Sequence, residues 1–117
     1  MKKLNFLFLL FFTGLSCIAQ WNFVGIPGIS NGWTVNNDIE IDTSGIPVVV
    51  FYENTMYKAS CLKFNGTQWI HVDSLKLHSY PIDNLYDLEI DKRNNYYILF
   101  RDSQTYKLSC IKFNGST

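Results

Sequence analysis

The chain carries one segment twice. Residues 38–68 align without a gap with residues 87–117, and 13 of the 31 aligned residues are identical. Several of the remaining pairs exchange one apolar side chain for another, as Ile39 does with Leu88. The two segments are offset by 49 residues, a period typical of arrays in which each repeat is one supersecondary unit. We therefore expect two similar structural units.

Each unit begins with a segment in which acidic and apolar residues alternate. In residues 38–42 this alternation predicts a half-buried strand, with Ile39 and Ile41 on the buried side. The acidic side chains would then form its solvated face. A row of carboxylates could also line a channel or hold calcium, because several oxygens suit a hard cation. The rows are Asp38, Glu40 and Asp42 in the first unit, and Asp87, Glu89 and Asp91 in the second.

Three further strands follow in the unit. β-Branched and aromatic runs predict strands at 47–53 and 58–64, and a fourth at 68–72. A turn at 42–45 and the Asn65-Gly66 pair separate them. The predicted fold class is all-β, with antiparallel four-stranded, blade-like repeats of about 49 residues that form part of a β-propeller.

The first 19 residues have the pattern of a secretory signal peptide. Lys2 and Lys3 precede an apolar run over residues 4–12, and small side chains favour cleavage after Ala19. Lipid attachment at Cys17 is the alternative, which we consider less favoured. The apolar stretch is too short to span a membrane. We expect a secreted protein, either extracellular or at the cell surface.

The remaining residues 20–117 are predicted to be an incomplete propeller. Residues 21–25 resemble residues 69–73, which predicts a fourth strand at 21–25 ahead of a complete unit at 38–73 and a partial unit at 87–117. Propellers carry about 4–8 blades. The other blades are expected either from sequence lost after Thr117 or from further copies of the chain, which would then be a homo-oligomer.

Charge and cysteine content limit the partners. Residues 20–117 contain 8 Lys and Arg against 10 Asp and Glu, a formal charge of −2, so no nucleic-acid partner is expected. Cys61 and Cys110 occupy equivalent positions of the two units. In neighbouring packed sheets such positions lie about 10 Å apart, beyond disulfide reach. We expect two buried free thiols.

The repeated motif resembles that of a known family. Asp42, Gly45, Pro47, Val49 and Phe51, followed by residues 63–67 (KFNGT) and Trp69, look like the β-propeller repeat of large secreted bacterial proteins, many of which carry a type IX secretion sorting domain. Trp21, Val24, Gly25 and Val72 extend the resemblance. In the second unit Asn94 and Tyr96 replace Gly45 and Pro47, and Asn tolerates the same turn geometry. The resemblance implies an extracellular scaffold and no catalytic motif.

Few residues are candidates for chemistry. His71 and His78 are the only histidines, and we expect them to pack or to face solvent. No catalytic, metal-binding or cofactor-binding motif is present. Trp21 and Trp69 occupy a repeated position, which favours a role in the core. Trp33 lies in a Gly/Asn-rich loop without a counterpart and is the one candidate for ligand contact.

Three functions are compatible with these patterns. The leading hypothesis is a secreted, non-catalytic propeller scaffold that binds carbohydrate or protein at the cell surface. The first alternative is an extracellular hydrolase or lyase whose active site lies in blades outside this chain. The second is a two-blade lectin that self-assembles into a closed ring.

Overall fold

The computed structural model describes residues 19–72 and 76–114 of the 117-residue chain. In these ranges the chain forms two antiparallel sheets and a short 3-10 helix, η2 (Leu77–Ser79), and it has no α-helix. No helix there is long and apolar enough to cross a membrane. The all-β class is confirmed. The strands are β1 (Thr34–Ile41), β2 (Pro47–Glu53), β3 (Lys58–Phe64), β4 (Trp69–His71), β5 (Ile82–Ile90), β6 (Tyr96–Asp102) and β7 (Leu108–Phe113).

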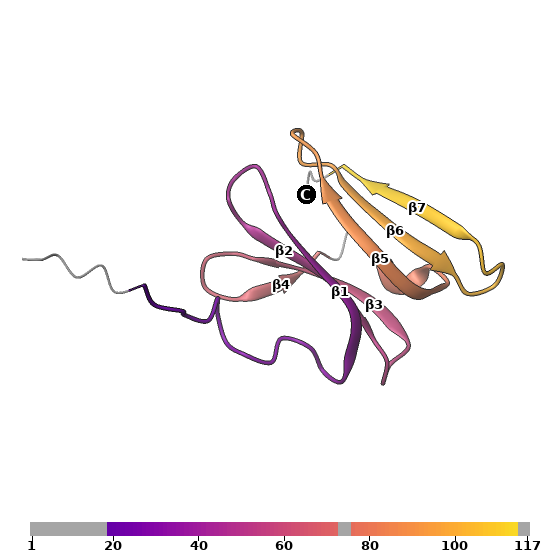
Figure 1. The fold of residues 1–117 in the computed structure, drawn as a ribbon, viewed down its shortest axis with the longest axis horizontal. Coiled ribbons are helices and arrows are strands. Elements are labelled where there is room, and N and C mark those ends of the chain that lie inside the picture. The colour runs from indigo at the N-terminus through magenta and orange to yellow at the C-terminus, as the bar shows by residue number, and fades with distance from the viewer. Residues whose placement is uncertain (1–18, 73–75, 115–117) are drawn as a thin grey trace, which may run out of the picture.

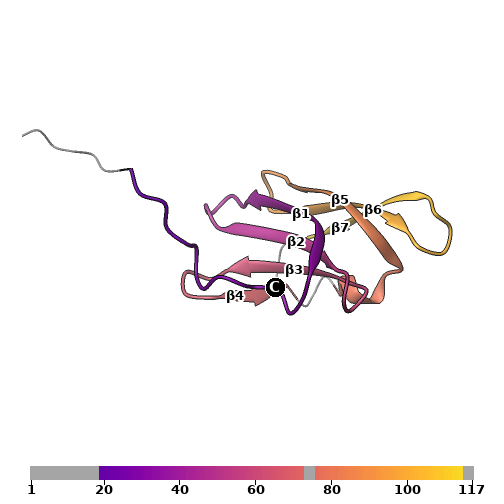
Figure 2. The same cartoon turned by 60° about the horizontal axis from the view of Figure 1, so that its bottom comes forward.

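Figure 1 shows the two sheets, and Figure 2 shows the strand order of the first sheet, β1-β2-β3-β4. A short loop joins β3 to β4, and the Asn65 side chain organises it. The Oδ1 atom of Asn65 accepts hydrogen bonds from the backbone N–H groups of Thr67 and Gln68, at 2.9 and 2.8 Å. Gly66 has a φ of 96°, which a residue without a Cβ adopts readily. The Asn-Gly pair therefore forms the hairpin that the sequence predicts.

The second sheet has the order β5-β6-β7 and pairs its strands in the register of the first. Val50 lies opposite Cys61, and Leu99 lies opposite Cys110, each residue 49 positions later. Five of the six pairs of β1 with β2 recur between β5 and β6 at the same spacing. Residues 49 positions apart therefore occupy equivalent places on equivalent faces of the two sheets.

The hydrophobic core lies between the sheets. β5 packs across β1, β2 and β3, so that the sheets lie face to face (Figures 1 and 2). Val48 and Val50 of the first sheet and Leu88 and Ile98 of the second belong to one cluster, and all four are fully buried. Burying one such side chain stabilises the fold by about 1.5–3 kcal/mol. This interface is thus the main apolar contact that holds the two units together.

The first acidic row faces the second sheet, so the prediction of a solvated face is wrong for this row, whereas the first two residues of the second row are exposed as predicted. Asp38 Oδ2 accepts a hydrogen bond of 2.8 Å from the backbone N–H of Leu88, and Asp42 is buried. Ile39 and Ile41, predicted on the buried side, are 56% and 55% exposed. The reason is that β2 is apolar on both faces, so the alternation within β1 does not indicate which face the next sheet covers.

The turn after β1 is built around the Asp42 carboxylate. Its Oδ1 atom accepts hydrogen bonds from the N–H groups of Ser44 and Ile46, at 2.8 and 2.9 Å. Its Oδ2 atom forms an ion pair of 2.8 Å with Lys63. Burial opposes ionisation of Asp42, but Lys63 and the two N–H groups outweigh it and keep the pKa of the carboxyl below its usual value.

The equivalent turn of the second sheet replaces glycine with asparagine. Asn94 has a φ of 60°, close to the 78° of Gly45 at the same position. Asp91 Oδ1 accepts hydrogen bonds from the N–H groups of Arg93 and Asn95, as Asp42 does in its own turn. The left-handed geometry is kept, because Asn tolerates it better than other residues with a side chain.

The N-terminal segment departs from its prediction. Residues 21–25 form no strand, and Trp21 is fully exposed, so the predicted fourth strand is wrong for this structure. A strand needs a neighbouring edge with which to pair, and residues 21–25 pair with no strand within the described residues. Apart from Ala19, the predicted signal peptide and Cys17 lie outside those residues.

Candidate ligand-binding pocket

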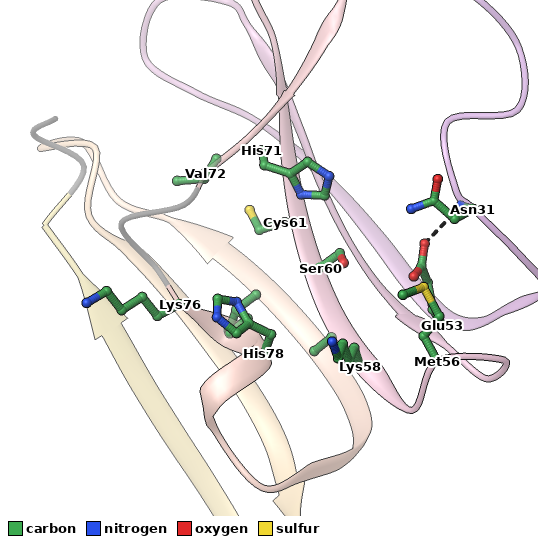
Figure 3. A pocket seen from close by; sticks show the side chains of 12 residues that line it. Asn31, Glu53, Met56, Lys58, Ser60, Cys61, His71, Val72, Lys76 and His78 are labelled. Atoms are coloured by element: carbon green, nitrogen blue, oxygen red, sulfur yellow. Dashed lines mark hydrogen bonds between the residues drawn. The ribbon is translucent and has the colours of Figure 1, made fainter.

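The main polar hollow lies where η2 packs against β3 and the end of β4 (Figure 3). Its volume is about 360 Å³. Three segments that are distant in sequence meet there, namely the N-terminal segment before β1, the β2–β3 hairpin, and η2 with the residues that flank it. Both polar and apolar groups line the pocket: Asn31, Glu53, Met56, Lys58, Ala59, Ser60, Cys61, His71, Val72, Lys76, Leu77 and His78.

Glu53 is fixed in one wall of the pocket. It ends β2, is only 4% exposed, and its Oε1 atom accepts a hydrogen bond of 3.0 Å from the backbone N–H of Asn31. Figure 3 shows this contact on the side of the pocket opposite Lys76. The bond holds the N-terminal segment against the sheet and leaves one carboxylate oxygen for other donors.

Nitrogen donors occupy the other walls. His71 of β4 and His78 of η2 both line the hollow, together with Lys58 at the start of β3 (Figure 3). The sequence predicts that both histidines pack or face solvent, and both are indeed exposed, but the fold also brings them to one pocket. Imidazole, ammonium, hydroxyl and carboxylate groups together can donate to and accept from a ligand that carries hydroxyl groups.

The pocket thiol is not a nucleophile. Burial raises the pKa of Cys61 to about 12, so the thiol stays protonated at neutral pH. Cys61 and Cys110 are both free, as the sequence predicts, but only Cys61 is buried. The prediction of a buried Cys110 is wrong, because its face of the second sheet has no neighbouring sheet to cover it in the described chain.

Trp33 lies near this pocket but does not line it. Its side chain is 67% exposed, and its backbone carbonyl accepts a hydrogen bond of 2.9 Å from the N–H of Asn54, the residue after Glu53. Trp33 is therefore fixed beside the pocket by its backbone, while its ring is free. Its predicted contact with a ligand stays a prediction.

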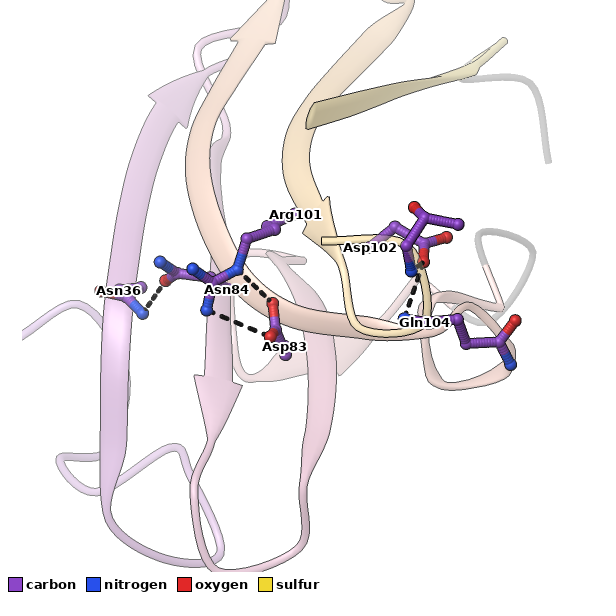
Figure 4. A network of polar contacts seen from close by, with 7 residues as sticks. Asn36, Asp83, Asn84, Arg101, Asp102 and Gln104 are labelled. Atoms are coloured by element: carbon purple, nitrogen blue, oxygen red, sulfur yellow. Dashed lines mark hydrogen bonds and ion pairs between the residues drawn. The ribbon is translucent and has the colours of Figure 1, made fainter. Parts of the chain in front are cut away.

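A second polar cluster lies at the other sheet and links strands to one another (Figure 4). Arg101 of β6 makes a bidentate contact with Asp83 of β5, at 3.0 and 3.1 Å. The Asn36 side chain of β1 donates a hydrogen bond to Asn84 of β5, which joins the two sheets. The charged groups of this cluster pair with each other, so we assign it a structural role.

The acidic rows do not form a cation site in this part of the chain. Within residues 19–72 and 76–114, no group of three or more His, Cys, Asp or Glu side chains is arranged to hold a metal ion. In the first row, Asp42 pairs with Lys63 and Asp38 bonds to the second sheet. The first acidic row therefore contributes to folding contacts.

Sequence patterns do not reveal this pocket. Glu53, Lys58, Ser60 and Cys61 recur as Asp102, Lys107, Ser109 and Cys110 in the second unit, which the repeat alone explains. Asn31 and His78 lie outside the repeated segments. The one usable signal is the group of polar residues at the ends of the two predicted strands 47–53 and 58–64.

Comparison of the chain with protein-family models, with curated proteins and with solved structures finds no match.

Proposed function

We propose that this chain is an exported, non-catalytic scaffold of the β-propeller type, in which the two sheets are neighbouring blades, and that it binds a carbohydrate at the cell surface. The observation that carries the binding function is the lining of the pocket beside η2. Its volume of about 360 Å³ is in the range of small-ligand sites, about 300–1,000 Å³. A pocket of this size favours a sugar over a protein, which would need a much larger surface.

The polar groups suit sugar hydroxyls. Glu53 and Ser60 offer acceptors, Lys58 and the histidines offer donors, and Met56 and Leu77 add apolar surface. Of the lining residues, all in the described ranges, Glu53 alone carries a carboxylate. Glycoside hydrolysis usually needs a pair of carboxylates, so this lining supports binding over hydrolysis. Trp33, beside the pocket, would stack on a sugar ring.

The propeller interpretation is supported by the repeat of the strand register. The two sheets pair equivalent residues at a constant spacing and pack face to face. The hydrophobic leader-like residues 1–19 support export. The propeller fold and the export of the chain are therefore parts of the same proposal.

A glycan array probed with the purified chain tests the binding function. Binding to a defined group of glycans is expected, and Lys58→Ala should reduce the affinity at least about tenfold, or about 1.4 kcal/mol. Lys107→Ala is the matched control, because Lys107 is the equivalent residue of the second unit and lies outside the pocket. Trp33→Ala should also weaken binding without a change in thermal stability.

The proposal would be contradicted by an array without any bound glycan. It would equally be contradicted by glycan binding that Lys58→Ala and Trp33→Ala leave unchanged. A protein captured by the chain in place of a glycan, with the same dependence on Lys58, would keep the pocket and replace the ligand class.

A further inference from the structure

The outer face of the first sheet, which points away from the second sheet, consists of residues whose equivalents 49 positions later are buried. On the second sheet, Leu88 and Ile98 point toward the first sheet and are fully buried. The residues 49 positions earlier are Ile39 and Val49, and they point away from the second sheet. Ile39 is 56% exposed where Leu88 is 0% exposed.

This outer face is also hollowed. The N-terminal segment crosses the sheet near β3 and β4, where Trp69 Nε1 donates a hydrogen bond of 2.8 Å to the carbonyl of Val24. Over β1 and β2 a hollow of about 370 Å³ remains, mainly apolar in character. We call this the open face; its apolar lining is Ile29, Ile39, Val49 and Phe51.

Within the described residues, the second sheet has a face of the complementary kind that no other element covers. The face of the first sheet that packs against the second sheet includes Val50, Ala59 and Cys61, which are buried. Their equivalents on the second sheet point outward, and we call them the receiving face. The receiving face consists of Leu99, Leu108 and Cys110. Leu108 is 64% exposed, and Cys110 is also exposed.

The contact between the sheets shows what fits such faces. In this contact the first sheet contributes the face that is equivalent to the receiving face, and the second sheet contributes the face that is equivalent to the open face. The contact therefore joins two different surfaces. Repeating that contact between molecules is a heterologous association, which gives rings or filaments. We propose that the open face of one chain docks on the receiving face of a second copy of the same chain.

A polar contact is available in the same place. Within one chain the Asp38 carboxylate accepts the N–H of Leu88 across the sheet interface. The residue equivalent to Asp38 is Asp87, which is exposed. The residue equivalent to Leu88 is Ile39, whose N–H donates a hydrogen bond of 2.8 Å to the Asp38 side chain of the same chain. In the assembly Asp87 of one copy takes the place of Asp38 as the acceptor of the Ile39 N–H of the next copy. This inference does not depend on the ligand pocket, which lies elsewhere.

Mixing two variants tests the proposal by sedimentation velocity under reducing conditions. Ile39→Asp blocks the open face and Leu108→Asp blocks the receiving face, and both sites are exposed, so each variant should fold. The unmodified chain is expected to form species larger than a monomer, and each variant alone should be monomeric. An equal mixture should give a dimer and nothing larger, because one intact face of each kind remains.

Tyr57→Asp is the control, since Tyr57 is 78% exposed in the turn between β2 and β3 and lies on neither face. It should assemble like the unmodified chain. Circular dichroism verifies folding, and Ile41→Asp with Cys110→Asp replaces any variant that fails. A monomeric unmodified chain at the highest soluble concentration, or a mixture that stays monomeric or grows beyond a dimer, would overturn the proposal.

Discussion

Asp42 and Asp91 occupy the same position in the two turns and differ in their surroundings. Both carboxylates accept two backbone N–H groups of their own turn. Asp42 is also buried and paired with Lys63, whereas Asp91 Oδ2 accepts a bond of 2.7 Å from the Asn95 side chain. The two residues therefore separate the effect of the turn from the effect of the ion pair.

Asp42→Asn is expected to destabilise the protein more than Asp91→Asn. Asparagine keeps an oxygen for the turn but removes the charge that faces Lys63, and a hydrogen bond to a charged group contributes about 1.5–3 kcal/mol. Lys63 is partly exposed, so the loss should lie near 1.5 kcal/mol, at the lower end of that range. Urea unfolding of the two variants measures the difference. Equal losses would contradict the role of the ion pair.

The two cysteines should differ in reactivity. Cys61 is buried with a pKa of about 12, and Cys110 is exposed. Iodoacetamide at about pH 8 should modify Cys110 within minutes and Cys61 only after denaturation, because the thiolate is the reactive form. Mass spectrometry of peptides locates the label. Rapid labelling of Cys61 in the folded chain would disprove its burial.

At the scale of the elements, the sequence predicts the central strands well. β2 and β3 have the predicted bounds 47–53 and 58–64, because their runs of β-branched and aromatic residues have no competing pattern. β1 starts four residues before its prediction, at Thr34. A register shift between Val35 and Asp38, with Asn36 at a φ of 52°, breaks the period of two and hides the first part of the strand.

The pocket is harder to predict than the strands. Glu53 and Lys58 lie at the ends of predicted strands, but the hollow exists only because η2 turns back onto β3. The histidines carry no motif and reach the pocket through this tertiary contact. Trp33, the one residue predicted from sequence, lies beside the site and not in it.

Leu88 and Ile39 occupy the same position of the two units, but only Leu88 is buried, so the pair allows a matched test of burial. Leu88→Ala removes a fully buried side chain and should cost about 2–5 kcal/mol. Ile39→Ala, at the equivalent position, should cost less than about 1 kcal/mol at dilutions where the chain is monomeric, since surface substitutions have small effects. Thermal unfolding of both variants gives the comparison. Similar losses would show that the exposed face is covered.

At the scale of the whole molecule, the two sheets of the described chain form a stack with the open face at one end and the receiving face at the other. The two units pair their strands in the same register. One face of each sheet is covered, and these two faces meet in the core between the sheets. The repeat of the sequence predicts similar units, but not which faces meet, because β2 is apolar on both sides. The stack is set by the contacts of β5 with β1, β2 and β3.

The stack should lose stability in acid. The pKa of Asp42 is lowered, and hydrogen bonds, first from the Asn95 side chain, lower the pKa of Asp91 to about 2. Both groups bind protons more weakly in the folded chain than in the unfolded chain, so their stabilisation is complete above about pH 4 and is lost as the pH falls toward 2. Melting temperatures over this range should fall with decreasing pH. A melting temperature that stays constant would contradict these shifts.

Methyl NOE spectroscopy tests the stacked arrangement most directly. The arrangement predicts NOEs that join the methyl groups of Val48 and Val50 to those of Leu88 and Ile98, because all four belong to the core between the sheets. It also predicts that Ile39, on the opposite face, has no NOE to the second sheet at concentrations where the chain is monomeric. NOEs confined within each sheet, or NOEs from Ile39 to Leu88 in that monomer, would contradict it.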